Sequence, residues 1–142
     1  MSTQRPLHLK IEDAAGLETA ADYYHDAVFS PEDAIYDPER SAFVLMLWRE
    51  KEGRRVPTRI PFWKRRVDHW ARCKLTFKYV RRADIRLYDP GVWPTLNLLR
   101  YNMSESKVEF LISGPMDVTL HIWRLEAELE DTGEVSSSPD SS

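Results

Sequence analysis

The chain has 142 residues, of which 42% are hydrophobic and 11% aromatic, and its formal net charge at pH 7 is −3. This length and apolar content predict one domain with a substantial hydrophobic core. No apolar run approaches the roughly 20 residues that a membrane-spanning helix needs, and the first residues lack the hydrophobic middle of a secretory signal. We therefore expect a cytoplasmic protein without a membrane partner.

The charge is distributed unevenly along the chain. The segment from Arg49 to Arg86 holds fourteen basic and four acidic residues, a net charge of +10. The remaining sequence holds six basic and nineteen acidic residues, a net charge of −13. The middle and the flanks are thus electrostatically complementary.

The first elements are predicted to be a strand and a helix. Residues 7–11 alternate between apolar and polar side chains, which is typical of a half-buried strand. From Gly16 to Phe29 the apolar residues recur at spacings of three and four, which predicts a helix. This helix should end at Ser30, because proline at position 31 disfavours a helical conformation in the residue before it.

Two apolar runs, 34–36 and 43–48, flank the turn sequence 37–40, and this order predicts a hairpin. The second run is apolar on both faces, so we expect a central strand that is covered on both sides or by a partner. Residues 72–87 keep one alternating phase. We interpret them as a single long strand that is bent or bulged near Arg81.

Three further strands are predicted at 96–103, 107–113 and 117–130. The alternation in the last of them slips near Trp123 and Arg124, which indicates a bulge. Residues 131–142 are rich in serine and acidic residues, and we expect a disordered tail after a single domain formed by residues 1–130. The predicted fold class is α+β: a mainly antiparallel β-sheet, sandwich or half-barrel, of about seven or eight strands, with one N-terminal helix packed on it.

Motifs for catalysis are missing from the sequence. The four histidines lack the spacing of metal ligands on one face, and the five glycines are too dispersed to form a phosphate-binding loop. The single cysteine, Cys73, shares a strand face with Leu75 and Phe77, where a thiol behaves as a small core residue with a raised pKa. We therefore expect no catalytic residue, no metal and no cofactor, and a protein that is not an enzyme.

A stripe of basic side chains is the main candidate for a functional surface. Nucleic-acid-binding proteins combine such cations with aromatic rings. Three interpretations remain open: a cross-strand ladder with the alternating carboxylates Glu126, Glu128 and Glu130, an acidic protein partner, or a nucleic acid. The candidate residues are Arg72, Lys74, Lys78, Arg82 and Arg86 in one strand phase, with Lys64, Arg65 and Arg66 upstream.

Tryptophans are the second candidate feature, because this residue dominates the binding energy of many interfaces. Trp63, Trp70 and Trp93 are the candidate interface aromatics. Homodimerisation would also cover the strand that is apolar on both faces. We predict a non-catalytic module that binds a protein through its sheet surface; the alternatives are nucleic-acid binding and the transport of a small apolar ligand in an aromatic cavity.

The layout of residues 23–50 resembles small, β-rich, uncharacterised bacterial families, some of them similar to immunity proteins. The resemblance rests on a helix that ends in Tyr-Tyr-His-Asp-Ala-Val-Phe, followed by Ile35-Tyr36-Asp37 and then by the apolar run 43–47. It implies a binding role without catalysis and supplies no site residues.

Overall fold

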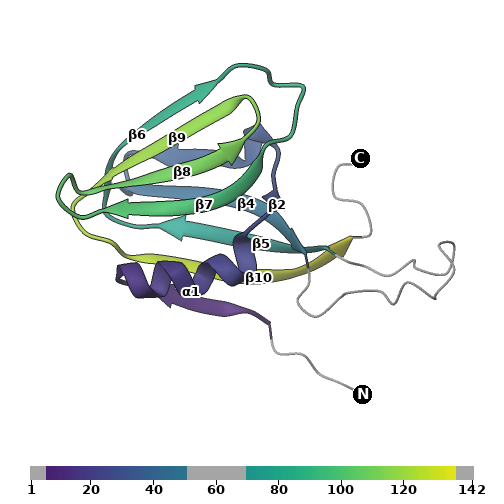
Figure 1. The fold of residues 1–142 in the computed structure, drawn as a ribbon, viewed down its shortest axis with the longest axis horizontal. Coiled ribbons are helices and arrows are strands. Elements are labelled where there is room, and N and C mark those ends of the chain that lie inside the picture. The colour runs from purple at the N-terminus through teal and green to yellow at the C-terminus, as the bar shows by residue number, and fades with distance from the viewer. Residues whose placement is uncertain (1–5, 51–69, 137–142) are drawn as a thin grey trace, which may run out of the picture.

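The computed structural model describes residues 6–50 and 70–136, and these form one large antiparallel sheet with a single α-helix (Figure 1). Every strand pair in the sheet is antiparallel. The elements in chain order are β1 (His8–Ile11), α1 (Ala14–Tyr24), β2 (Ala27–Val28), the 3₁₀ turn η1 (Pro31–Asp33), β3 (Ala34–Asp37), β4 (Ala42–Glu50), β5 (Trp70–Phe77), β6 (Val80–Leu87), β7 (Thr95–Asn102), β8 (Lys107–Ser113), β9 (Met116–Ile122) and β10 (Ala127–Ser136).

The strands follow the order β1-β10-β5-β4-β2-β7-β8-β9-β6, and β3 also pairs with β4. One edge of β4 pairs with β5 from Phe43 to Glu50, whereas the other edge pairs first with β3 and then, at Trp48, with β2. The sheet curls so that β7, β8, β9 and β6 form one half and β4, β5 and β10 the other (Figure 1). Strands β1 and β6 are left at the two ends of the order.

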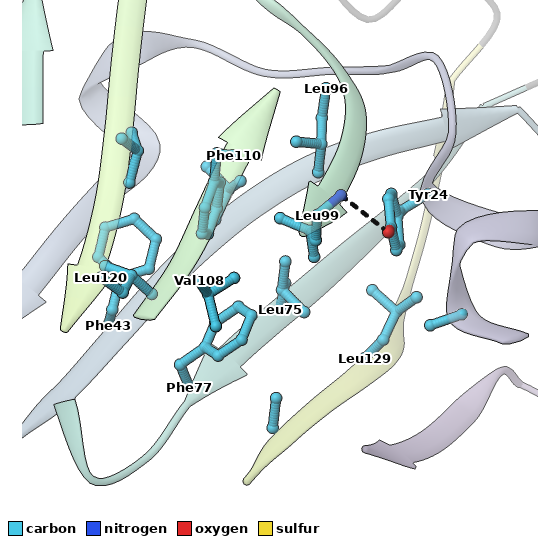
Figure 2. Packing of buried hydrophobic residues seen from close by; sticks show 14 of the residues in the cluster. Tyr24, Phe43, Leu75, Phe77, Leu96, Leu99, Val108, Phe110, Leu120 and Leu129 are labelled. Atoms are coloured by element: carbon cyan, nitrogen blue, oxygen red, sulfur yellow. Dashed lines mark hydrogen bonds between the residues drawn. The ribbon is translucent and has the colours of Figure 1, made fainter. Parts of the chain in front are cut away.

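The core fills the space between the two halves. The ring of Phe110 from β8 lies 5.6 Å from the ring of Phe43 on β4 and 5.7 Å from that of Phe77 on β5 (Figure 2). Large aromatic rings in this arrangement bury much apolar area and fix the spacing of the halves. The main hydrophobic contacts of the fold are therefore made between strands that are distant in the sequence.

Helix α1 begins at its N-cap, Asp13, whose carboxylate accepts a hydrogen bond from the backbone N–H of Gly16 at 2.7 Å. Its buried residues include Leu17 and Tyr24. The Tyr24 hydroxyl accepts a hydrogen bond from the backbone N–H of Leu99 on β7 at 3.0 Å (Figure 2). Neither α1 nor η1, the helices of the described residues, is long and apolar enough to cross a membrane.

The predicted sheet and single helix are confirmed, but the described strands number ten instead of about seven or eight. The helix ends at Tyr24, well before the predicted end at Ser30, because Ala27 and Val28 form β2 and pair with β4 and β7. Asp26, with a φ of 66°, makes the turn between α1 and β2. Periodicity could not reveal this change, because a two-residue strand has no period.

The predicted long strand at 72–87 is two strands in different halves of the sheet. Strand β5 pairs with β4 and β10, whereas β6 pairs with β9. The chain turns between them at Tyr79, whose φ is 57°. The predicted bulge near Arg81 is confirmed, because the β6–β9 register shifts between Val80 and Arg82.

The predicted strand at 117–130 is also divided, because β9 ends at Ile122 and β10 begins at Ala127. The phase slip near Trp123 marks this change of strand. The last strand extends past the predicted tail boundary at residue 131: β10 continues to Ser136, and the Asp131 side chain is bound by Arg49. Residues 137–142 of the predicted tail lie outside the described residues.

Candidate functional site

The basic stripe is divided by the fold. Arg72 and Lys74 lie on β5, Lys78 follows that strand, and Arg82 and Arg86 lie on β6 in the other half of the sheet. The turn at Tyr79 separates the two groups. The five side chains therefore do not form one continuous surface.

Three residues of the stripe have carboxylate partners. An Arg72 guanidinium nitrogen lies 3.1 Å from Asp33, and its guanidinium carbon lies 5.1 Å from the centre of the Trp48 ring. The Arg82 guanidinium lies 3.3 Å from Asp84. The Lys78 ammonium lies 3.7 Å from Glu126 and 3.6 Å from Glu128.

The cross-strand ladder expected between the stripe and the acidic strand is formed in part. Strand β10 pairs with β5, and Glu130 is opposite Lys74 in the register. Lys78 makes ion pairs with two of the three predicted carboxylates. Within 6–50 and 70–136, Lys74 and Arg86 have no ion pair.

The two predicted interface tryptophans that the structure describes, Trp70 and Trp93, are not the most exposed of the described aromatics. Trp70 begins β5 and Trp93 lies in the loop after β6, and both are half-buried. Trp63, together with Lys64, Arg65 and Arg66, lies outside the described residues. The most exposed described tryptophan is Trp123, with 64% of its surface accessible, in the segment between β9 and β10.

Trp123 belongs to a surface cluster that we name the aromatic rim, formed by Tyr79, Met103, Trp123 and Arg124. The backbone N–H of Trp123 donates a hydrogen bond to the carbonyl of Tyr79 at 3.0 Å. The guanidinium carbon of Arg124 lies 3.9 Å from the centre of the Tyr79 ring, which is a close cation–π contact. Met103 is 71% exposed. Three segments that are distant in the sequence thus meet at one corner of the sheet.

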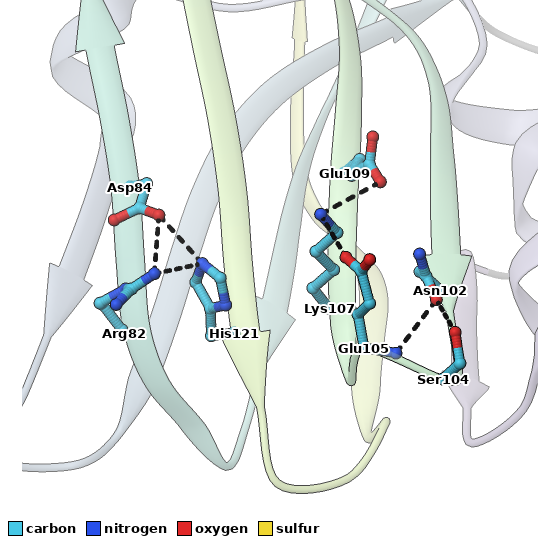
Figure 3. A network of polar contacts seen from close by, with 8 residues as sticks. All are labelled: Arg82, Asp84, Asn102, Ser104, Glu105, Lys107, Glu109 and His121. Carbon is cyan, nitrogen blue, oxygen red and sulfur yellow. Dashed lines mark hydrogen bonds and ion pairs between the residues drawn. The ribbon is translucent and has the colours of Figure 1, made fainter.

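The turn from β7 to β8, which carries Met103, is held by its own polar groups. The Asn102 side-chain oxygen accepts hydrogen bonds from the Ser104 hydroxyl at 2.9 Å and from the Glu105 N–H at 3.1 Å (Figure 3). The carbonyl of Ser106 accepts a hydrogen bond from the N–H of Ile122, the last residue of β9. Met103 and Trp123 are therefore presented by segments that are fastened to each other.

An open cleft of about 430 Å³ lies beside the rim. Its charged residues are three carboxylates, Glu12, Asp13 and Glu126, and one guanidinium, Arg124. Arg124 lies 3.4 Å from Glu126, so this pair is neutral and the other two carboxylates leave the cleft with a net charge of −2. The other lining residues are Ala14, Tyr101, Met103, Trp123 and Leu125. The cleft therefore combines aromatic surface with negative charge.

A second polar cluster lies on the outer face of β6 and β9. The Nε2 atom of His121 lies 2.9 Å from an Asp84 carboxylate oxygen and 2.9 Å from an Arg82 guanidinium nitrogen (Figure 3). The hydrogen bond with His121 is the main cause that lowers the pKa of Asp84, and the nearby Arg82 charge acts in the same direction. The same face carries an open hollow of about 400 Å³ that Asp84, Arg86 and Asp117 help to line.

A buried network joins three strands at one end of the core. Arg49 makes two hydrogen bonds to Asp131, at 3.1 and 2.9 Å, and the Cys73 thiol donates a third to Asp131 at 3.0 Å. Burial of the thiol, reinforced by the hydrogen bond to Asp131, raises the pKa of Cys73. The prediction that this thiol is a core residue with a raised pKa is confirmed, and the network has the features of a structural ion pair.

One group of possible metal ligands was missed in the sequence, because it joins β1 to β10. His8, Glu128 and Glu130 each have a ligand atom within 4.8 Å of the others. Glu128 already accepts a hydrogen bond from the His8 ring at 3.1 Å and lies 3.6 Å from the Lys78 ammonium. The hydrogen bond with His8 contributes most to the lowered pKa of Glu128. The group is an exposed ion-pair network between the outer faces of two strands.

The described residues, a ten-stranded antiparallel sheet with one α-helix, an exposed aromatic corner and a buried ion pair, define the class of small α+β domains. A family model described as "Protein of unknown function (DUF2948)" matches residues 7–141, and the chain belongs to this family. The family is uncharacterised, as the resemblance of residues 23–50 implied, but the match gives no support to a likeness with immunity proteins. Searches of curated proteins and of solved structures found no match.

Proposed function

We propose that the protein is a non-catalytic binding module that recognises another protein through the aromatic rim. The observation that carries this proposal is the position of Trp123, a large ring that is 64% exposed beside an open cleft. Tryptophan, tyrosine and arginine are the residues most enriched in the centres of protein interfaces. The rim holds one of each.

The rim is also pre-organised for binding. The Trp123 backbone is hydrogen bonded to Tyr79, and the Arg124 guanidinium already lies over the Tyr79 ring. A surface that is ordered before binding loses less conformational entropy when a partner arrives. Met103 adds a flexible side chain that adapts to the shape of a partner.

The chemistry of the cleft favours a basic side chain of the partner. Glu12 and Asp13 are not balanced by the Arg124–Glu126 pair, and the Trp123 ring lies beside them. A lysine or arginine side chain in this position would gain both a carboxylate partner and a cation–π contact. This differs from the acidic partner that the basic stripe suggested, because three described stripe residues already have carboxylate partners.

A non-catalytic role is supported by the state of the reactive groups. The Cys73 thiol is fully buried, and its pKa is raised by that burial and by the hydrogen bond to Asp131. The Nε2 atom of the His121 ring lies within hydrogen-bond distance of both Asp84 and Arg82 on an open sheet face. Neither group combines an activated nucleophile or base with an enclosed site.

Selection from a phage-displayed peptide library against the purified full chain tests the proposal. Enriched peptides should carry lysine or arginine next to an apolar residue, and Trp123→Ala should abolish their binding. Leu98→Ala is the matched control, because Leu98 is an exposed apolar residue of β7 outside the rim. Enrichment of acidic peptides, or equal binding to Trp123→Ala and the wild type, would overturn the proposal.

A further inference from the structure

Strand β6 is the longer of the two strands that end the sheet order. It has eight residues, whereas β1 has four, and within the described part of the chain it pairs only with β9. An edge strand of this length presents unpaired backbone N–H and C=O groups to another strand. Natural proteins usually cover or shorten such an edge.

The inner face of β6 exposes apolar side chains. Ile85 and Leu87 are opposite the buried residues Val118 and Met116 of β9, so they lie on the core side of the sheet. Nevertheless, 37% of Ile85 and 43% of Leu87 is accessible. These side chains remain exposed because no described strand follows β6 to complete the layer.

The outer face of β6 carries the alternating charges Arg82, Asp84 and Arg86. Asp84 is bound by Arg82 and by His121 of β9. Arg86 is opposite Asp117 in the register but has no ion pair within the described ranges. The edge therefore offers one cation without a carboxylate partner next to an exposed apolar pair.

We propose that β6 pairs with β6 of a second copy of this chain, in antiparallel fashion, around a two-fold axis at Ile85. On the inner face this register places Ile85 opposite its own copy and Ala83 opposite Leu87. On the outer face it places Asp84 of each copy opposite Arg86 of the other. The strand is thus self-complementary in both charge and hydrophobicity, which a two-fold interface requires.

Neighbouring registers do not have this property. An axis at Asp84 places Asp84 opposite itself and Arg82 opposite Arg86, and an axis at Arg86 places Arg86 opposite itself. Like charges directly opposite each other are destabilising. The pattern of β6 therefore selects the axis at Ile85 over both single-residue shifts.

An axis at Ala83 would also pair opposite charges, Arg82 with Asp84, but it requires Val80 to lie opposite Arg86. Val80 is already engaged, because its N–H donates to the Ser41 carbonyl at 2.8 Å and its carbonyl accepts from the Tyr36 hydroxyl at 3.0 Å. The free part of the edge therefore begins after Val80. The axis at Ile85 uses only this free part.

This inference is independent of the proposed function, because the aromatic rim contributes no residue to the β6 pair. A single added strand pair is a small interface, so association should be weak and dependent on concentration. The proposed dimer would continue the sheet from one copy into the next.

Sedimentation velocity of the full chain, from about 1 µM to about 1 mM, covers the concentrations at which such a weak complex forms. The wild type should change from monomer to dimer across this range. Asp84→Arg and Arg86→Asp should each weaken the dimer about tenfold or more, because each places two like-charged pairs across the axis. Arg100→Asp, a charge change of the same kind at an exposed position of β7, should leave the association unchanged.

Mixing the two weakened variants gives the decisive result. Every opposed pair between Asp84→Arg and Arg86→Asp combines one arginine with one aspartate, so the mixture should form a one-to-one heterodimer at least as readily as the wild type. Recovery on mixing also shows that both variants are folded. A monomeric wild type over the whole range, or Arg86→Asp that associates as the wild type does, would overturn the proposal.

Discussion

The Arg49–Asp131 pair shows how single residues set the limits of the fold. Arg49, with 8% of its surface accessible, is the one polar or charged residue among the buried residues that the structure describes, and Asp131 is its counter-charge. Asp131 also accepts a hydrogen bond from the Leu7 N–H at 2.9 Å, while its own N–H donates to the Leu7 carbonyl. One carboxylate therefore joins β4, β5 and the segment before β1 to the middle of β10.

Replacement of this carboxylate should be costly. We expect Asp131→Asn to lower the free energy of unfolding by about 3 to 5 kcal/mol, because it leaves the Arg49 charge buried without a partner. Urea denaturation measures this change. Glu134→Gln, an exposed substitution in the same strand, is the control and should change stability by less than about 0.5 kcal/mol.

The same prediction has a pH signature. Burial acts to raise the pKa of Asp131, but hydrogen bonds from Arg49, Cys73 and Leu7 outweigh it, and the pKa in the folded protein is lowered. The stabilisation is therefore fully present above the unfolded pKa of about 3.9 and is lost as the pH falls through the lower folded value. The difference in the free energy of unfolding between the wild type and Asp131→Asn should therefore shrink in acid. A difference that stays constant as the pH falls would contradict the lowered pKa of Asp131.

At the scale of elements, the turn between β7 and β8 holds a residue in a strained conformation. Ser106 has a φ of 52°, in the left-handed region that glycine adopts more readily than other residues. We expect Ser106→Gly to raise the free energy of unfolding by about 0.5 to 1 kcal/mol, measured by thermal or urea denaturation. Ser104→Gly in the same turn lacks a positive φ to relieve, and it should give no gain.

Elements with a clear period were predictable from the sequence. The alternation in 107–113 and the turn sequence 37–40 led to β8 and to the β3–β4 hairpin. The changes of strand at Tyr79 and at Trp123 were not predictable as such, because the alternation keeps one phase through Tyr79 and shows only a phase slip at Trp123. It does not show which neighbour the next strand will pair with.

The candidate site was predictable to a smaller extent. The basic stripe was visible as a pattern, but the pairing of Arg72 with Asp33, which lies 39 positions away, depends on the tertiary fold. In the sequence, Trp123 marks only the position of a phase slip. Its exposure follows from the way in which β9 ends against the β7–β8 turn. The partners Arg49 and Asp131 are 82 positions apart, and no local pattern connects them.

At the scale of the molecule, Phe110 is the side chain through which the two halves of the sheet meet. It contacts Phe43 and Phe77 at centroid distances of 5.6 and 5.7 Å. Phe110→Ala should lower the free energy of unfolding by about 3 to 5 kcal/mol, because it removes both ring contacts and leaves a cavity. Leu98→Ala on neighbouring β7, an exposed position, should cost less than about 1 kcal/mol in the same denaturation experiment. If the two variants lost the same free energy of unfolding, the halves of the sheet would not be held together at Phe110.

The pairing of β1 with β10 affects how the chain acquires its structure over time. His8 and Glu128, which meet across this pair, are 120 positions apart. Closing so long a loop costs entropy before any contact compensates for it, and topologies dominated by distant pairings fold slowly. On the ribosome, β1 emerges long before β10, the one strand that pairs with it within the described residues, has been made. Its half-buried residue Leu9 must then stay exposed to water or to a chaperone until β10 is complete.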